Sequence, residues 1–340
     1  MIQSKSIKYA LFITSLVLQT SQKLEANESV NPASENVTIS GDFTFDYGNI
    51  STLDEENINL WLLKLYAKYD LSKLIGTKSA FYSSFAMHRG DRARPEGNLQ
   101  GFNNIDADEI AKVYEAFFQF EFSEKHSIKI GRQDANVDFA APNFAGEFLN
   151  PSMGFSPTIL LPSYGTPVLA VSYHHSISDS ANIKLGLFES TLSNKTFDEQ
   201  FIIAQYEHIF SSGIYIKLGG WYDTSIDYGN GYAIAEYQYN NDVSITLQYG
   251  EANREKVGLT NHLGISLNRY NLFYPNDVIG IGYTTVNAKA SNEHIVEFFY
   301  GYQLSEHIKL KADVQNINSK GVFNSTSNVV TTTLRFQFNF

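Results

Sequence analysis

The 340-residue sequence contains no cysteine, which excludes disulfide bonds, thiol catalysis and cysteine-based metal sites. Charged residues make up only 18% of the chain, and the 25 basic residues are outnumbered by 36 acidic ones. This acidic balance argues against nucleic acid as a partner, because phosphate binding needs basic patches. The mean hydropathy of −0.22 and the lack of long apolar runs also exclude a helical membrane protein.

The sequence also lacks the motifs of common catalytic sites. No H-E-x-x-H, G-x-S-x-G or phosphate-binding glycine loop is present. His174 and His175 are adjacent, so on a strand they point to opposite faces and cannot bind one metal ion together. We therefore expect no catalytic residue, no metal site and no cofactor.

The N-terminal residues have the pattern of an export signal. Lys5 and Lys8 precede the apolar segment Tyr9–Leu18, and a tolerable cleavage site follows. The apolar run is about half the length that a membrane-spanning helix needs. A short buried helix is the alternative interpretation. We expect residues 1–26 to be a signal peptide and residues 27–39 to be a polar segment in the periplasm.

What the chain has in abundance is alternation of apolar and polar residues. It divides into sixteen segments of about ten residues, each apolar on one face, which is the pattern of an outer-membrane β-barrel. In such a barrel the apolar face meets lipid, whereas in a soluble sandwich it would point inward. The expected strands are Ser40–Ile50, Asn57–Asp70, Thr77–His88, Ile110–Phe122, Ser127–Gln133, Val168–His175, Asn182–Ser190, Glu199–Phe210, Gly213–Thr224, Tyr232–Asn240, Asp242–Gly250, Gly258–Tyr270, Asp277–Asn287, Glu293–Leu304, His307–Asn316 and Asn328–Phe340.

The connections between these segments alternate in length, as they do in transmembrane barrels with short periplasmic turns and longer external loops. The expected long loops are residues 89–109, 134–167, 251–257 and 317–327. The sequence therefore predicts an all-β fold, a transmembrane antiparallel barrel of sixteen strands over residues 40–340. A barrel of this size encloses an aqueous channel.

The longest connection, Asp134–Pro167, is unusual in composition. It holds five of the eight prolines, at positions 142, 151, 157, 162 and 167, and it is rich in apolar residues. A loop this long without secondary structure is normally functional or disordered. Its apolar residues disfavour disorder, so we expect this third external loop to fold into the lumen and narrow it.

Three blocks of sequence resemble the carbohydrate-selective porin family of the OprB type. They are Gly97–Phe122, Ile130–Pro157 with its GRQDAN start, and a weaker block formed by Tyr274–Tyr283 and Glu293–Asn316. The resemblance implies a sixteen-stranded barrel in the outer membrane of a Gram-negative bacterium. It also implies passive diffusion of sugars, such as the monosaccharide glucose, through a constricted channel.

Sugar passage needs hydrogen-bonding groups along a wet path, and binding weak enough for the solute to leave. The long loop and its start supply such groups. An alternative is that the same side chains pin the loop to the barrel wall through salt bridges. The candidate solute-binding residues at the constriction are Arg132, Asp134, Asn136, Asp138, Asn143, Glu147 and Asn150.

Strand parity predicts which wall residues face the lumen. In residues 110–122, the parity places Tyr114 and Phe118 toward lipid and the acidic residues toward the channel. For each residue predicted to face the lumen, the alternative to a specific contact with the solute is ordinary solvation by the water in the channel. The predicted lumen-facing residues are Lys64, Glu115, Gln119, Glu121, Glu236, Glu297, Lys309, Lys311 and Arg335.

The expected partners are small sugars and outer-membrane lipid. The basic cluster Arg89, Arg92 and Arg94 in an external loop offers a site for lipopolysaccharide phosphates or other anions, although a solvated loop is the alternative. The C-terminal phenylalanines, ending at Phe340, resemble the signal read by the barrel assembly machinery. The chain could be a monomer or a homotrimer. The alternative functions are a general or ion-conducting porin, an outer-membrane barrel hydrolase and a soluble all-β sugar-binding protein.

Overall fold

The computed structural model describes residues 36–51, 56–91, 98–192, 198–289, 291–322 and 325–340. The predicted signal peptide lies outside the described residues, as do residues 27–35 of the polar segment and Arg92 and Arg94 of the basic cluster. Across the described ranges, no helix has the length and apolar character required to span a membrane.

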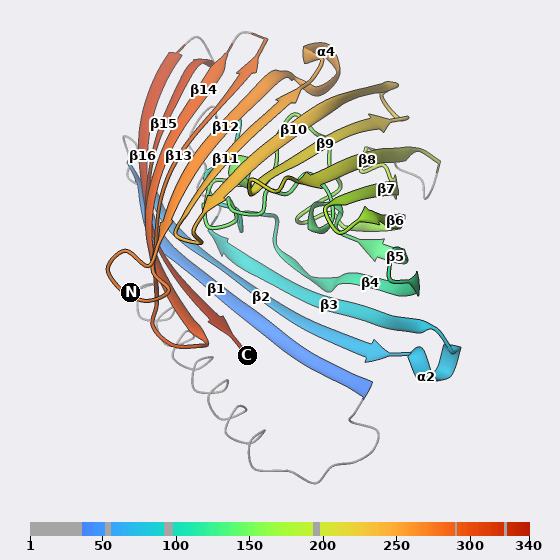
Figure 1. Cartoon of the computed structure of the whole chain (residues 1–340). Helices are drawn as coiled ribbons and strands as arrows, with labels where there is room; N and C mark the ends of the chain where they lie inside the picture. The colour runs from blue at the N-terminus through green and yellow to red at the C-terminus, as the bar shows by residue number, and fades with distance from the viewer. Residues whose placement is uncertain (1–35, 52–55, 92–97, 193–197, 290, 323–324) are drawn as a thin grey trace.

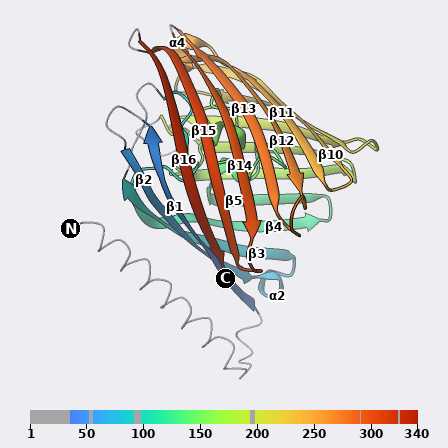
Figure 2. The same ribbon diagram turned by 90° about the vertical axis from the view of Figure 1, so that its left-hand side faces the viewer.

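The described residues form sixteen strands in one closed antiparallel barrel (Figures 1 and 2). Each strand pairs with its neighbours in sequence, and the barrel closes where β1 pairs with β16. The described connections contain four short helical segments: α2 (Ser72–Ile75), η2 (Ala135–Val137), α3 (Pro151–Gly154) and α4 (Arg254–Val257). The strands are β1 (Val37–Ser51), β2 (Glu56–Asp70), β3 (Lys78–Asp91), β4 (Ile110–Ser123), β5 (His126–Gln133), β6 (Val168–Ser178), β7 (Ala181–Glu189), β8 (Gln200–Ile209), β9 (Ile214–Asp223), β10 (Tyr228–Tyr239), β11 (Val243–Glu251), β12 (Leu259–Tyr270), β13 (Val278–Ala288), β14 (Asn292–Gln303), β15 (Ile308–Val322) and β16 (Ser325–Asn339).

The predicted strand number and the closed antiparallel topology are confirmed. Several strand boundaries differ from the prediction by three residues or more. β1 begins at Val37, inside the segment expected to precede the barrel. β15 and β16 continue through most of the loop expected at residues 317–327, because their ladder is paired as far as Val322 and Ser325.

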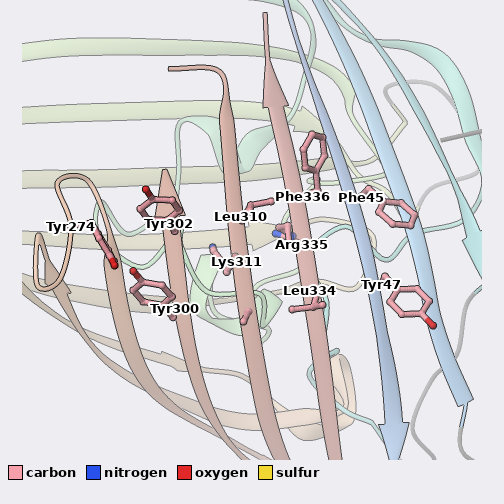
Figure 3. A pocket seen from close by; sticks show the side chains of 11 residues that line it. Phe45, Tyr47, Tyr274, Tyr300, Tyr302, Leu310, Lys311, Leu334, Arg335 and Phe336 are labelled. Atoms are coloured by element: carbon pink, nitrogen blue, oxygen red, sulfur yellow. The ribbon is translucent and has the colours of Figure 1, made fainter. Parts of the chain in front are cut away.

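The outer face of the barrel carries the apolar half of each alternating pattern. Leu185, Leu247 and Val314 are each more than 40% exposed, while their sequence neighbours point inward. Figure 3 shows part of this outer wall, where aromatic and leucine side chains of β14, β15, β16 and β1 lie together. A continuous apolar belt of this kind suits hydrocarbon rather than water.

A bulge in β4 changes which residues face the lumen. Ser84 pairs with Glu115 and Phe85 pairs with Val113, so Tyr114 is an extra residue on its strand. Val113 is 53% exposed on the outer face, whereas Tyr114 is 2% exposed. The prediction that Tyr114 faces lipid is therefore wrong, because it counted the alternation along an unbroken strand.

Two connections fold back inside the barrel. They are residues 98–109, between β3 and β4, and residues 134–167, between β5 and β6. Both bond to wall side chains on the face opposite the exposed apolar belt, and these side chains come from strands around the barrel. A segment in contact with so many strands of a closed barrel must lie within it (Figure 1). The insertion of residues 98–109 was not predicted, since they were expected to form an external loop.

The inserted segments form small apolar cores with parts of the inner wall. Phe139 and Ile159 pack against Phe188, Phe201 and neighbouring wall residues of β7–β10. Phe102 packs against residues of β1, β2, β14, β15 and β16, and Phe148 packs against Phe299. Burial of one such ring contributes about 1.5–3 kcal/mol. The inner face is thus apolar where the inserted segments cover it, and not uniformly polar as the parity rule suggested.

Candidate functional site

Three wall glutamates hold the main chain of the inserted segments. The Glu236 carboxylate accepts hydrogen bonds from the backbone N–H groups of Asn143 and Phe144, both at 2.9 Å. Glu297 accepts from Leu149 N at 2.5 Å and Asn150 N at 3.1 Å. In each case two consecutive N–H groups share one carboxylate.

Glu293 repeats this arrangement for the other inserted segment. Its carboxylate accepts from Leu99 N at 3.1 Å and Gln100 N at 3.0 Å. Buried N–H groups need acceptors, and a segment without strand or helix ladders must find them elsewhere. The wall glutamates supply them, which explains how such long connections stay ordered without secondary structure.

Lysine ammonium groups and side-chain amides of the wall donate hydrogen bonds to backbone carbonyl groups of the same segments. Lys184 donates to Asp138 O at 3.1 Å, Lys217 donates to Ala141 O at 2.6 Å, and Lys311 donates to Glu147 O. The wall therefore carries donors and acceptors that match the backbone of the insert. The side-chain amides that act in the same way are Gln248 on Met153 O, Asn268 on Phe144 O and Gln315 on Phe102 O.

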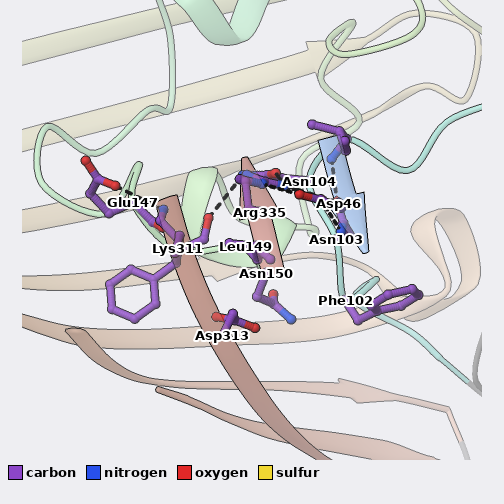
Figure 4. Close-up of polar contacts among 12 residues, drawn as sticks. Asp46, Phe102, Asn103, Asn104, Glu147, Leu149, Asn150, Lys311, Asp313 and Arg335 are labelled. Atoms are coloured by element: carbon purple, nitrogen blue, oxygen red, sulfur yellow. Dashed lines mark hydrogen bonds and ion pairs between the residues drawn. The ribbon is translucent and has the colours of Figure 1, made fainter. Parts of the chain in front are cut away.

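Charged groups of the wall hold the two inserted segments at further places (Figure 4). Arg335 donates to both carboxylate oxygens of Asp46 at 2.7 Å, and Asp46 accepts from Asn103 Nδ2 at 2.6 Å. Arg335 also donates to Asn104 Oδ1 at 2.8 Å. A bidentate, buried arginine–carboxylate pair is among the stronger protein contacts, so β1, β16 and the first inserted segment are joined firmly.

Glu147 forms the second ionic contact. Its carboxylate pairs with Lys309 and, at 3.0 Å, with Lys311. Burial alone would raise the pKa of Glu147, but the two lysine ammonium groups outweigh it and lower that pKa to about 2. Glu147 therefore stays ionised near neutral pH and ties the middle of the long insert to β15.

Arg132 is not in the lumen, contrary to the prediction. It pairs with Ala116 on β4 and with Leu169 on β6, and Leu169 is 37% exposed on the outer face. Its neighbour Gln133 points inward and accepts a hydrogen bond from Ser172. The side chain of Arg132 therefore shares the outer face with Ile130, because residues two apart on a strand point the same way.

The other predicted loop residues do lie inside the barrel, where most of them bond to protein. Asp134 accepts from Tyr114 Oη at 2.5 Å and from Asn136 N, while its own N–H donates to Glu115. Burial raises the pKa of Asp134. Asn150 caps α3 through Ser152 N and donates to Gly101 O, which joins the two inserted segments.

Asp138 and Asn143 remain partly open to the lumen. Asp138 accepts two hydrogen bonds from Lys129 at 2.8 Å, and Asn143 accepts one from Lys217 at 2.8 Å. The predicted wall residues Lys64, Glu115, Gln119 and Glu121 point inward as expected, as do the glutamates and basic residues of β10, β14, β15 and β16 described above.

The inserted segments bury Leu60, Leu62 and Tyr114 on the inner wall of β2–β5, but leave the part of that wall nearer the start of β1 uncovered. Lys64, Tyr66 and Lys68 lie on this face, and Tyr66 is 37% exposed. The Lys64 ammonium lies 5.5 Å from the ring centre of Tyr114 and 5.6 Å from that of Tyr164. The face thus combines aromatic rings with amines held in place by cation–π contacts.

The same arrangement continues along β3–β5. Tyr82 and Phe117 stack with their centroids 5.2 Å apart. Lys68 lies 5.3 Å from the centre of the Tyr82 ring, and Lys129 lies 5.4 Å from that of Phe117. Sequence reasoning missed Tyr66, Lys68, Tyr82 and Phe117, although the parity that selected Lys64 and Gln119 also applies to them.

A polar cavity of about 300 Å³ adjoins this wall on the side of the insert nearer the start of β1. Gln119, Ser127, Lys129, Asp138, Ser172 and Lys184 line it. Phe139, Tyr173 and His174 complete the lining, so both hydrogen-bonding groups and rings border the cavity, which suits a solute rich in hydroxyl groups. The described residues contain no cluster of three or more His, Asp or Glu that could hold a metal ion.

The comparisons with known proteins agree on one family and one fold. The model of the family described as "Carbohydrate-selective porin, OprB family" matches residues 55–207 and 228–340. No curated protein matches the sequence.

Solved porins share the fold. The high-pH structure of Pseudomonas putida OprB superposes with a TM-score of 0.81 at 14% identity, covering 90% of this chain and 95% of that one. The low-pH structure of the same protein superposes with a TM-score of 0.63 at 15% identity, covering 90% of this chain and 93% of that one. A mutant of the Rh. blastica porin superposes with a TM-score of 0.64 at 14% identity, covering 89% of this chain and 100% of that one.

Proposed function

This chain belongs to the carbohydrate-selective porin family of the OprB type, and from that premise we propose that sugars cross its barrel along the uncovered part of the inner wall of β2–β5. The protein is a porin for the passive diffusion of carbohydrates, with a barrel that spans the outer membrane of a Gram-negative bacterium. A channel, rather than an enzyme, fits both the family and the fold.

The observation that supports this path is the exposure of the wall that lies beyond the contacts of residues 134–167. These residues bond to β7, β9, β10, β12, β14 and β15, and also to Tyr114 and Glu115 on β4 and to Lys129 on β5. Nearer the start of β1, the inner wall offers Tyr66, Lys64 and Gln119. Ring faces can contact the C–H surface of a pyranose, while amines and amides bond to its hydroxyls. Contacts of this kind are weak and numerous, as conduction requires.

In this proposal residues 134–167 form the constriction, and their predicted polar residues have two roles. Asp138 and Asn143 face the passing solute. Asp134, Glu147 and Asn150 hold the insert in position, which is the alternative that the sequence left open. Asn136 belongs with the second group, because its amide donates to Phe139 O.

We also propose that residues 1–26 are removed on export, and that the last strand carries the signal for barrel assembly. Phe340 N–H donates to Gly41 O, and its ring stacks on that of Phe338 on the outer face. A terminal aromatic strand that closes the barrel is a suitable recognition element. Monosaccharides such as glucose are the solutes that we expect.

The test is single-channel conductance in planar bilayers with sugars as blockers. Glucose should reduce the ion current more than an inert polyol of equal size. In a Tyr66→Leu variant this difference should fall several-fold, while the current without sugar changes little. Equal block by glucose and the polyol would make the protein a general porin and refute sugar selectivity.

The matched control is Tyr206→Leu, which removes a tyrosine of similar exposure from the outer face of β8. It should leave sugar block unchanged. If Tyr66→Leu and Tyr206→Leu behave alike while glucose still blocks preferentially, sugars take another path through the barrel.

A further inference from the structure

A groove of about 710 Å³ crosses the outer wall over β14, β15, β16 and β1 (Figure 3). Its floor is Leu310 and Ala312 on β15. Tyr300 and Tyr302 on β14, with Tyr274 from the turn before β13, form one side. The residues of the other side are Leu334, Phe336, Phe45 and Tyr47.

The groove exists because a small residue lies between large ones. Ala312 pairs with Tyr300 on one neighbouring strand and with Leu334 on the other. Its methyl group leaves the space that a larger side chain would fill. The larger side chains on the neighbouring strands β14 and β16 project beyond this methyl group and form the two sides of the groove.

The turn Asn271–Asn276 extends one wall beyond the strand ends. The Asp277 carboxylate accepts from the backbone N–H groups of Leu272 at 2.7 Å and of Phe273 and Tyr274 at 3.0 Å. It also accepts from Tyr300 Oη at 3.2 Å, which draws the turn toward the outer face. The Tyr274 ring then meets the Tyr302 ring edge to face, with centroids 5.4 Å apart.

We propose that this groove binds one acyl chain of a phospholipid in the periplasmic leaflet. The groove is continuous with the exposed apolar belt that faces lipid, and its walls are almost entirely ring and methyl surface. The two basic residues that border it, Lys311 and Arg335, direct their charges to Glu147 and Asp46 in the lumen. The ligand that fits is therefore an uncharged hydrocarbon chain.

The position of the turn sets the leaflet. The turn lies at the same end of the barrel as the start of β1 and the end of β16, and barrels of this class carry short turns and chain ends on the periplasmic side. Leu272, Phe273 and Tyr274 are 45%, 65% and 57% exposed. Aromatic side chains with polar hydroxyls suit the boundary between acyl chains and headgroups, so the turn lies beside the lipid and not in the periplasm.

Native mass spectrometry of the full-length protein, incubated with phosphatidylethanolamine and then washed in mild detergent, tests the site. The wild type should retain one phospholipid. Ala312→Phe fills the floor and should reduce retention at least several-fold. The matched control is Ala204→Phe, an exposed outward-facing alanine on β8 that does not line this groove, and it should retain lipid like the wild type.

Equal retention by the wild type and Ala312→Phe would refute the proposal. Loss of a trimer in Ala312→Phe, with no lipid on the wild type, would also refute it and would assign the groove to a second copy of this chain.

A second measurement does not depend on filling the floor. Because the chain has no cysteine, a spin label can be attached at Phe273→Cys alone in the barrel reconstituted in bilayers. The label should be more accessible to oxygen than to a water-soluble nickel chelate, whereas a label at Glu306→Cys on the next turn should show the reverse. Nickel accessibility at both positions would overturn the placement of the turn against lipid.

Discussion

Replacement of Glu236 by alanine is the most direct test of how the constriction is held. The Glu236 carboxylate accepts hydrogen bonds from Asn143 N and Phe144 N, and its burial leaves no water to replace them. A hydrogen bond to a charged group contributes about 1.5–3 kcal/mol, so loss of two weakens this attachment by about 3–6 kcal/mol. A free-energy difference of about 1.4 kcal/mol changes an equilibrium constant ten-fold. Detachment of the backbone at Asn143 and Phe144 from the wall should therefore become roughly a hundred-fold or more frequent.

Single-channel recording measures this effect. The Glu236→Ala channel should show strong open-state current noise and a larger mean conductance than the wild type. Its barrel should still resist detergent unless heated, since the strands and the Glu297 and Glu147 anchors remain. Glu121→Ala is the matched control, because Glu121 also faces the lumen but contacts Lys78 and Gln119 on the wall instead of the insert. Wild-type noise in Glu236→Ala, or equal noise in both variants, would refute the anchoring role.

Three further predictions follow from the lumen contacts. The pKa of Glu147 is about 2, below its ordinary value of 4.5. The stabilising effect of the Glu147 carboxylate is therefore complete above about pH 4.5 and is lost as the pH falls through 2. Current noise should rise on acidification in this range, and much less so in Glu147→Gln. Arg132→Ala should leave conductance and sugar block unchanged, since the side chain lies on the outer face; a clear change in either would contradict the observed register. Tyr114→Phe removes a 2.5 Å hydrogen bond to Asp134 and should destabilise the start of the insert by about 1–3 kcal/mol, measurable as faster proteolysis within residues 134–142 than in Tyr82→Phe.

The barrel itself was predictable because lipid imposes alternation on every strand. A residue in the wall faces either hydrocarbon or lumen, and this choice is visible in the sequence at Leu185, Leu247 and Val314. The rule fails where the backbone breaks it. Nothing in the residues around Tyr114 signals a bulge, so the parity of Val113 and Tyr114 was assigned incorrectly.

The error at Arg132 has a different origin. Ile128 and Ile130 already marked the outer face of β5, and Arg132 continues that row. The residue was assigned to the loop because it is charged and adjacent to it. Parity carried one residue further would have placed it correctly.

The anchoring of the insert could not be predicted from sequence. Parity placed Glu236 and Glu297 in the lumen, but their partners are peptide N–H groups far away in the chain, and a peptide group carries no side-chain signal. Residues 98–109 were missed for a similar reason. They are mostly small and polar, apart from Leu99, Phe102 and Ile105, and resemble a solvated loop, yet Glu293 and Asp46 hold them inside the barrel.

The attachment of the insert through its main chain has a consequence for how this pore can change. Since Glu236 recognises peptide groups, the residue type at the exposed position 143 can be exchanged without loss of that bond, provided that proline, which has no N–H, is avoided. The width and chemistry of the constriction can therefore change by substitution of side chains, in evolution or in an engineered nanopore, while the backbone of residues 134–167 keeps its position.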